Sequence, residues 1–255
     1  EKDVRVAGLD LLEKMNISKE LMVNLLADVI NTRSVEEQQA AVLTLGKLPV
    51  AATQSTFEGL LNKMAGNQLN SGILLELGEA IDSSRSPQLI ARYKEISGKL
   101  SPDALLASYT SSLEGGDPHR GRQVFFQNQN SQCIRCHTVD DKGGNAGPRL
   151  NGVANRISRK QILEALISPS ARLAPGFGMI TLKLKDGQNL TGILEGESKA
   201  GLKLKIGLEP EKVIPNEQIV EKKYASSSMP DMKVILSRKE IRDVVSFLAT
   251  LKENN

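Results

Sequence analysis

The first 113 residues contain a helical pattern that repeats at a nearly constant interval. When Leu12, Leu45 and Leu77 are aligned, the segments AGLDLLEKM, AAVLTLGKL and SGILLELGEA fall in register, at intervals of 33 and 32 residues. Each segment has apolar residues at helical spacing, and a second amphipathic helix follows it. Helix pairs repeated at this interval bury their apolar stripes against neighbouring pairs, as in an α-solenoid. We therefore predict a HEAT-like helical repeat domain at residues 1–113, with an irregular helical bundle as the alternative.

A stretch near the C-terminus has a period of two residues instead. ITLKLK at residues 180–185 and LKLKI at residues 202–206 alternate strictly, and KDGQ supplies a hairpin turn. Shorter strands are expected in NLTGIL, KVIP and QIVE. We predict a small antiparallel sheet or barrel inserted at about residues 176–223 of a mainly α chain. Its alternating lysines form either a solvated face or a docking surface for an acidic partner; they are Lys183, Lys185, Lys203 and Lys205.

Composition and charge exclude several classes of protein. A hydrophobic content of 40% with 25% charged residues is ordinary for a globular chain, and no apolar stretch is long enough to cross a bilayer. The first residues lack the pattern of a signal peptide, so we expect a mature end or a fragment boundary there. Residues 1–113 carry a net charge of −3 and the rest +6. With only 3% aromatic residues, this balance does not predict a nucleic-acid surface.

Both cysteines and one of the two histidines lie within five consecutive residues. Cys133 and Cys136 are three residues apart, which places both thiols on one face of a helical turn, and His137 follows directly. C-x-x-C-H is the attachment sequence of c-type haem: the thiols add to the porphyrin vinyl groups and the imidazole binds the iron. We therefore predict one covalently attached haem c in a domain at residues 114–255. Such a domain is expected in the periplasm or another extracytoplasmic compartment.

Three other uses of this cluster fit the sequence less well. A zinc site needs four ligands, and the other histidine, His119, is poorly spaced to supply the fourth. A thioredoxin-like redox pair follows a strand, whereas Asp117 and Pro118 predict a helix start before the motif. A structural disulfide between the two cysteines leaves the adjacent histidine without a role.

The segment before the motif resembles the N-terminal helix of class I cytochromes c. GRQVFF places Gly121 four residues before Phe125, like the glycine and the aromatic residue of that family. The resemblance implies that this helix crosses the last helix of the chain, which lies within SRKEIRDVVSFLATL. The candidate residues for that crossing are Ile241, Val245, Phe247 and Leu248.

The loop after the motif is similar to that family as well. GPRL implies that the Pro148 carbonyl accepts a hydrogen bond from the His137 ring, which orients the ring and raises its basicity. The same resemblance implies that Leu150 packs on the haem. Without the resemblance, Gly147 and Pro148 form an ordinary turn.

The sixth iron ligand is expected in the loop before the last helix. In SSSMPDMKVILSRKEI, Met229 is followed by Pro230, a spacer and a helix, the order in which class I cytochromes present an axial methionine. A thioether ligand favours ferrous iron, raises the potential and closes the site to other ligands. Met232 is the nearest alternative. Met179, His119 and an open sixth position are further ones.

Residues 120–251 resemble, almost from end to end, a haem-binding module of planctomycete and verrucomicrobial proteins. The similar segments are CIRCHTVDDKGGNAGPRLNGVANRISRKQILEALISPSARLAPGF, KDGQNLTGIL, and SSSMP with the terminal helix. In that family the module commonly ends large secreted proteins, after HEAT-like repeats and often after a β-propeller dehydrogenase-like domain. The resemblance implies that this chain is the C-terminal portion of such a protein.

Together these features predict an electron-transfer module with no catalytic residues rather than an enzyme. Nothing resembles a substrate pocket with paired acid and base groups, and His119 is expected to be exposed. Electrons would come from a fused or partner dehydrogenase and leave to another cytochrome or acceptor. Two alternatives stay open: a haem-based sensor with an absent or displaceable sixth ligand, and a solenoid-based interaction module with accessory haem. Arg149, Arg156 and Arg172 are either surface residues or partners of the haem propionates.

Overall fold

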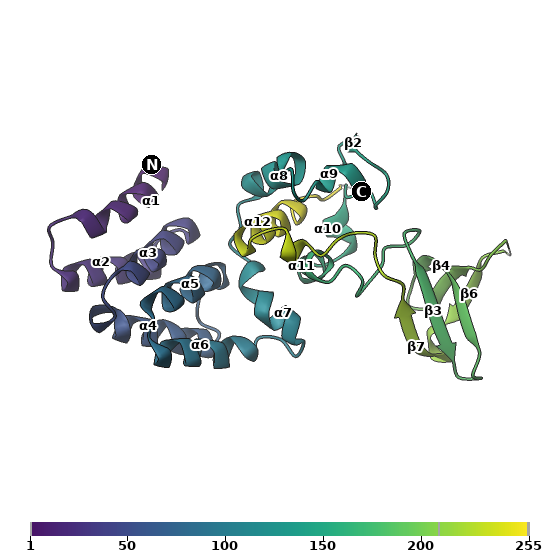
Figure 1. Cartoon of the computed structure of the whole chain (residues 1–255), viewed down its shortest axis with the longest axis horizontal. Coiled ribbons are helices and arrows are strands. Elements are labelled where there is room, and N and C mark those ends of the chain that lie inside the picture. The colour runs from purple at the N-terminus through teal and green to yellow at the C-terminus, as the bar shows by residue number, and fades with distance from the viewer. Residues whose placement is uncertain (1, 209, 254–255) are drawn as a thin grey trace. The chain divides into compact units, whose positions relative to one another are not determined.

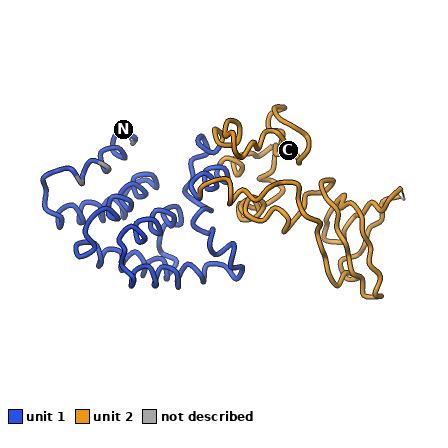
Figure 2. The backbone as a smooth tube through the Cα atoms, in the orientation of Figure 1, with its two compact units in different colours: residues 1–121, 238–246 blue, residues 122–237, 247–255 orange. Residues whose placement is uncertain are grey.

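The computed structural model describes residues 2–208 and 210–253. The chain divides into two compact units, residues 1–121 with 238–246 and residues 122–237 with 247–255 (Figure 2). The division falls inside the helices α8 (Pro118–Gln127) and α12 (Arg238–Leu248), so both helices contribute to both units. The domain boundary expected after residue 113 stays a prediction.

The first unit is mainly helical, as the periodicity predicts (Figure 1). Its longer helices are α1 (Lys2–Leu11), α2 (Lys19–Thr32), α3 (Val35–Lys47), α4 (Val50–Ala65), α5 (Leu74–Ser84) and α6 (Pro87–Gly98). The sequence pattern does not predict the short helix α7 (Ala104–Tyr109) or the three 3-10 turns, Leu12–Lys14, Ser71–Ile73 and Thr110–Ser112. Serine N-caps explain three of the helix starts, because the side chains of Ser18, Ser34 and Ser86 each accept a backbone N–H three residues later.

The aligned leucines of the repeat lie in or against one apolar core. Leu45 and Leu77 are fully buried, and Leu12 packs half-buried against the same cluster. Phe57 and Leu61 of α4 are also fully buried there. The periodicity therefore identifies the buried faces of these helices correctly, while the solenoid arrangement stays a prediction.

The second unit combines short helices with two antiparallel sheets. Besides α8 and α12, its helices are α9 (Cys133–Cys136), α10 (Val153–Arg156) and α11 (Arg159–Ile167). A small hairpin, β1 (Thr138–Val139) and β2 (Lys142–Gly143), follows α9 directly. The 3-10 turns are Asn216–Gln218 and Met232–Val234. The helix start expected near Asp117 is confirmed, since its carboxylate accepts the backbone N–H groups of His119 and Arg120 at 2.7 and 3.2 Å.

The larger sheet confirms the expected antiparallel strands, while their being an insert in a haem domain stays a prediction. Its strands are β3 (Met179–Leu184), β4 (Asn189–Glu197), β5 (Gly201–Lys205), β6 (Lys212–Pro215) and β7 (Ile219–Tyr224), in the order β6-β5-β4-β3-β7. Its apolar cluster comes from the sheet and its turns, with Ile180, Leu182, Leu202 and Leu204 all fully buried. Register shifts between Lys183 and Leu184, and between Leu194 and Gly196, mark bulges that help the sheet curve around this core.

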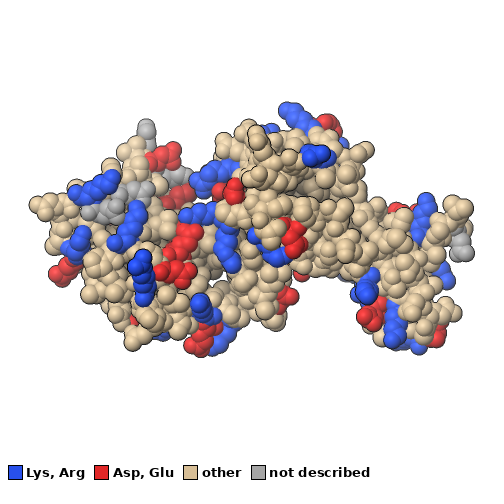
Figure 3. Space-filling model, viewed as in Figure 1, with Lys and Arg blue, Asp and Glu red and all other residues tan. Residues whose placement is uncertain are grey.

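The alternating lysines of the sheet are exposed, and their use as a docking surface stays a hypothesis. Lys183, Lys185, Lys203 and Lys205 are exposed, and Lys203 pairs with Glu211. Figure 3 shows basic side chains interspersed with acidic ones on the face that it draws. Within residues 2–208 and 210–253, no helix has the length and apolarity needed to cross a bilayer.

Candidate haem attachment site

The two thiols and the imidazole lie on one short turn. Cys133 and Cys136 bound α9, and the backbone N–H of His137 donates to the Cys133 carbonyl at 3.0 Å. Neither cysteine is in a disulfide; Cys133 is half-buried and Cys136 is exposed. Burial raises the pKa of the Cys133 thiol, whose Sγ lies 3.6 Å from Ser131 Oγ. Both sulfur atoms are therefore free for covalent attachment.

A hydrogen bond fixes the orientation of the His137 ring. Its Nδ1 lies 2.9 Å from the Pro148 carbonyl oxygen, which is the contact that the resemblance of GPRL implies. A carbonyl oxygen only accepts, so Nδ1 carries the proton and the lone pair is on Nε2. Burial lowers the pKa of His137, and the bond to Pro148 opposes that shift. The imidazole is therefore neutral at neutral pH, in the form that binds a metal.

The loop between β2 and α10 wraps around this turn. Its backbone N–H groups donate to two carbonyls of the motif and to that of Thr138, which follows the motif. The hydrogen bonds are Gly144 N to Ile134 O (2.8 Å), Gly147 N to Cys136 O (2.8 Å) and Leu150 N to Thr138 O (2.9 Å). The loop thereby holds Pro148 against the imidazole. Leu150, two residues further along the loop, is half-buried.

Two glycines permit this close approach. A Cβ at Gly144 would lie 1.9 Å from the Arg135 carbonyl oxygen, and a Cβ at Gly147 would lie 2.7 Å from His137 Cε1. Both distances are too short for any residue with a side chain. The sequence shows these glycines in KGGNAGPRL, yet the atoms that they approach become evident only in the folded chain.

We predict that Gly147→Ala displaces the His137 ring. The added methyl group overpacks the space beside the imidazole, so the free energy of unfolding should fall by about 1–3 kcal/mol. Chemical denaturation followed by circular dichroism measures the change. Gly59→Ala is the control, because, apart from its chain neighbours and the backbone of its own helix, no heavy atom lies within 4 Å of its Cβ position. A Gly147→Ala protein as stable as the wild type would contradict this prediction.

The two methionines of the last loop have different surroundings. Met232 is only 2% exposed and begins a 3-10 turn, where its carbonyl accepts the N–H groups of Ile235 and Leu236. Met229 is half-buried and outside any regular element, with its backbone N–H donating to Ser227 Oγ at 3.1 Å. Met232 is therefore buried, whereas Met229 is partly exposed. The choice of Met229 over Met232 as the iron ligand stays a prediction.

The loop that carries Met229 is anchored on both sides. Ser227 N donates to Ser170 Oγ at 3.0 Å, and Lys233 Nζ donates to the Ile167 carbonyl at 2.8 Å. Ile167 ends α11 and Ser170 follows it. The alternative ligand Met179 lies on β3 and is 49% exposed.

The three candidate arginines have partners within the protein. Arg149 Nη1 donates to Asp141 at 2.9 Å, and Arg172 pairs with Glu197 at 3.2 Å. Arg156 donates to the carbonyls of Arg149 and Asn151. Pairing of these arginines with haem propionates stays a hypothesis. His119 is exposed in the first turn of α8, as expected.

Comparison with known proteins identifies the segment around the motif. Residues 118–191 match the family model for cytochrome c. The cytochrome c domain therefore contains both cysteines, His137 and the loop that holds it, and the match ends within β4, before Met229. Proteins of this family are usually electron carriers rather than enzymes, hold haem c covalently and are typically extracytoplasmic. No curated protein matches the chain.

The residues present fit such a haem. Two free thiols flank one helical turn, and His137 Nε2 has no hydrogen-bond partner among the described residues. Across residues 2–208 and 210–253, no three His, Cys, Asp or Glu side chains converge to hold a metal ion. Cys133, Cys136 and His137 are thus not gathered around one point. Covalent haem uses the thiols and the imidazole at different atoms, whereas a tetrahedral zinc site needs four ligands around one ion.

Proposed function

We propose that this chain is a monohaem c-type cytochrome module for one-electron transfer. In this proposal Cys133 and Cys136 hold the porphyrin, and His137 Nε2 and the Met229 thioether bind the iron. The observation that carries it is the 2.9 Å hydrogen bond between His137 Nδ1 and the Pro148 carbonyl, directly after two free thiols. Because this bond occupies Nδ1, Nε2 is the ring nitrogen that stays available to the iron, next to the two cysteines.

The chain's own residues set the chemistry of the site. When bound, haem supplies the reversible one-electron couple. Pro148 holds the ring in one tautomer and makes Nε2 more basic, which strengthens it as an axial ligand. Leu150 packs on the macrocycle and excludes water, and the soft sulfur of Met229 favours the ferrous state and blocks other ligands.

The wider context of the module follows from the same proposal. Residues 1–113 serve as a HEAT-like scaffold, supported by the equivalent burial of Leu45 and Leu77. The module works in the periplasm or another extracytoplasmic compartment. Its electrons come from a fused or partner dehydrogenase and pass to another cytochrome or acceptor.

The test is the visible spectrum of the haem-loaded chain with and without Met229. We expect ferric wild type to show a sulfur-to-iron charge-transfer band that Met229→Ala loses. Ferrous Met229→Ala should bind carbon monoxide, whereas ferrous wild type should not, because the thioether occupies the sixth position. Met179→Ala, which removes an exposed methionine, is the control and should keep the band.

The same measurement distinguishes the proposed electron carrier from the main alternative, a haem-based sensor. Met229 lies in a loop without regular structure, an arrangement that also suits a displaceable ligand. Binding of carbon monoxide by ferrous wild type, with an identical spectrum for Met229→Ala, would overturn the closed electron carrier in favour of a haem-based sensor.

A further inference from the structure

The loop that carries Met229 is held at both ends by the residues that end α11 and follow it. The backbone N–H of Ser227 donates to Ser170 Oγ at 3.0 Å, and Lys233 Nζ donates to the Ile167 carbonyl at 2.8 Å. The two loop residues are six apart in the chain, whereas their two partners are only three apart. All four belong to the second compact unit. Both ends of the loop are therefore bonded to one short stretch of chain at the end of a single helix.

Two further contacts fix the inside of the loop. Ser227 Oγ accepts the backbone N–H of Met229 at 3.1 Å, which closes a serine turn directly before the methionine. Lys233 Nζ also pairs with Asp231, two residues after the methionine. The lysine side chain is 24% exposed, so water reaches it only in part. Met229 thus lies between a serine turn and an ion pair, and each of them is bonded to the end of α11.

The contact between Lys233 and Ile167 is of a kind that favours a cation. Ile167 is the last residue of α11, and the carbonyls of a last helical turn have no partners within the helix. These carbonyls also form the negative end of the helix dipole, so an ammonium group binds them more strongly than a neutral donor does. The turn Met232–Val234 packs against α11 as well. Lys233 therefore holds the second half of the loop on α11 by charge in addition to packing.

An ordered loop holds a metal ligand more firmly than a flexible one. A loop that already has its metal-bound conformation loses less conformational entropy when its ligand binds, and the groups that hold a ligand in place add to its affinity. We propose that Lys233 and Ser170 are positioning residues for the sixth iron ligand, so that the end of α11 sets how firmly Met229 holds the iron. This inference rests on the proposed function, because it requires Met229 to be the ligand.

The first experiment removes the lysine anchor in the full haem-loaded chain. Lys233→Met deletes the charge and the hydrogen-bond donor but keeps an unbranched side chain. Carbon monoxide binding to the ferrous protein reports how often the thioether leaves the iron. We expect the rate of this binding to rise about tenfold, the factor that corresponds to 1.4 kcal/mol, with a lower reduction potential and a weaker charge-transfer band. Lys233→Arg keeps a charged donor for the Ile167 carbonyl and should restore most of the wild-type behaviour.

Lys222 supplies the matched control. It lies on β7, five residues before Ser227, and is 33% exposed. Its Nζ pairs with Glu197 at 3.3 Å, a residue of β4 rather than of α11. Lys222→Met therefore removes a charge of similar exposure from the strand that leads into the loop, and it should match the wild type in rate, potential and band.

Ser170→Ala tests the other anchor and serves if Lys233→Met does not fold. Ser170 is exposed and lies outside α11, so this change should leave the fold intact. A hydrogen bond between neutral groups is about half as strong as a charged one, so we expect a smaller rise in the binding rate, about threefold.

Two results would overturn the inference. One is a folded Lys233→Met or Ser170→Ala protein with wild-type rate, potential and band. The other is a Lys222→Met protein that changes as much as Lys233→Met does. Absence of the charge-transfer band from the wild type would instead overturn the proposed function.

Discussion

Replacing both Cys133 and Cys136 by alanine is expected to make all of the bound haem extractable. In the proposed function the two thiols form the only covalent bonds between chain and porphyrin, and the axial ligands are lost in acid because His137 becomes protonated. Extraction of the haem-loaded protein with acidified butanone measures this directly. The wild type should keep its colour in the aqueous phase, and the double variant should lose it completely.

The single variants and a neighbouring control sharpen this result. Cys133→Ala and Cys136→Ala should each keep haem through the remaining thioether. Arg135→Ala removes an exposed side chain from the same turn, one that donates a hydrogen bond to Gln132 Oε1 at 2.6 Å, and should behave as the wild type does. If wild-type haem is extracted as completely as that of the double variant, the attachment hypothesis is wrong.

The features that sequence reasoning predicts correctly depend on neighbours close in the chain. Helical periodicity identifies the buried leucines Leu45 and Leu77, and alternation identifies strands β3 and β5 with their outward lysines. The attachment motif spans five residues, and the helix cap at Asp117 lies directly before α8. In each case the physical cause is local: a period of burial, a turn or a cap.

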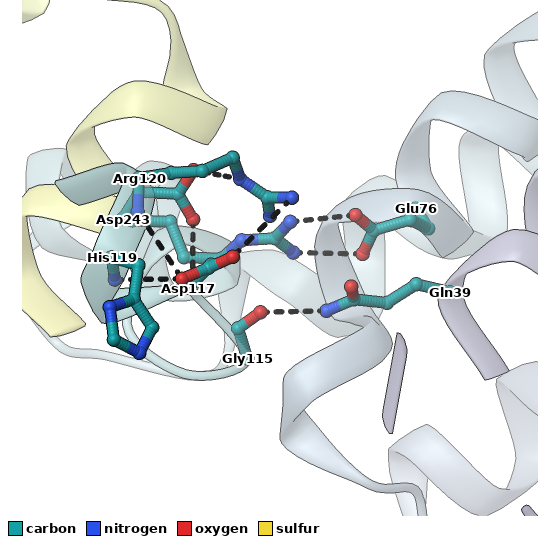
Figure 4. Close-up of polar contacts among 8 residues, drawn as sticks. Gln39, Glu76, Gly115, Asp117, His119, Arg120 and Asp243 are labelled. Carbon is teal, nitrogen blue, oxygen red and sulfur yellow. Dashed lines mark hydrogen bonds and ion pairs between the residues drawn. The ribbon is translucent and has the colours of Figure 1, made fainter. Parts of the chain in front are cut away.

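The features that it misses depend on tertiary packing. Arg242 is a charged residue in an amphipathic helix and would ordinarily be assigned to the solvent face, yet it is buried because Glu76 faces it from 166 residues away in the chain (Figure 4). Met229 and Met232 lie three residues apart in a polar stretch, and only the burial of Met232 against its neighbours distinguishes them. The close approach of Gly147 to the His137 ring is equally absent from any local pattern.

The second large effect is expected on stability, from Glu76→Ala. This change leaves the guanidinium of Arg242 buried without a counter-ion, and such a loss typically costs about 3–5 kcal/mol of the free energy of unfolding. Glu79→Ala removes the carboxylate of an exposed pair with Lys239, in which the two side chains are 46% and 40% exposed, and should cost less than about 1 kcal/mol. Urea denaturation of the full chain, followed by circular dichroism, measures both values.

The comparison distinguishes burial from mere proximity of charge. The two pairs join the same helices at similar nitrogen–oxygen distances, 2.8 Å for Arg242 with Glu76 and 2.9 Å for Lys239 with Glu79, so only their access to water and their hydrogen-bond geometry differ. Equal losses for the two variants would mean that solvent reaches the Glu76 carboxylate and that α12 is not clamped there. A large loss confined to Glu76→Ala, largely restored when Glu76→Leu is combined with Arg242→Met, would show that the unpaired charge causes the loss. The ion pair would then contribute orientation of α12 rather than net stability.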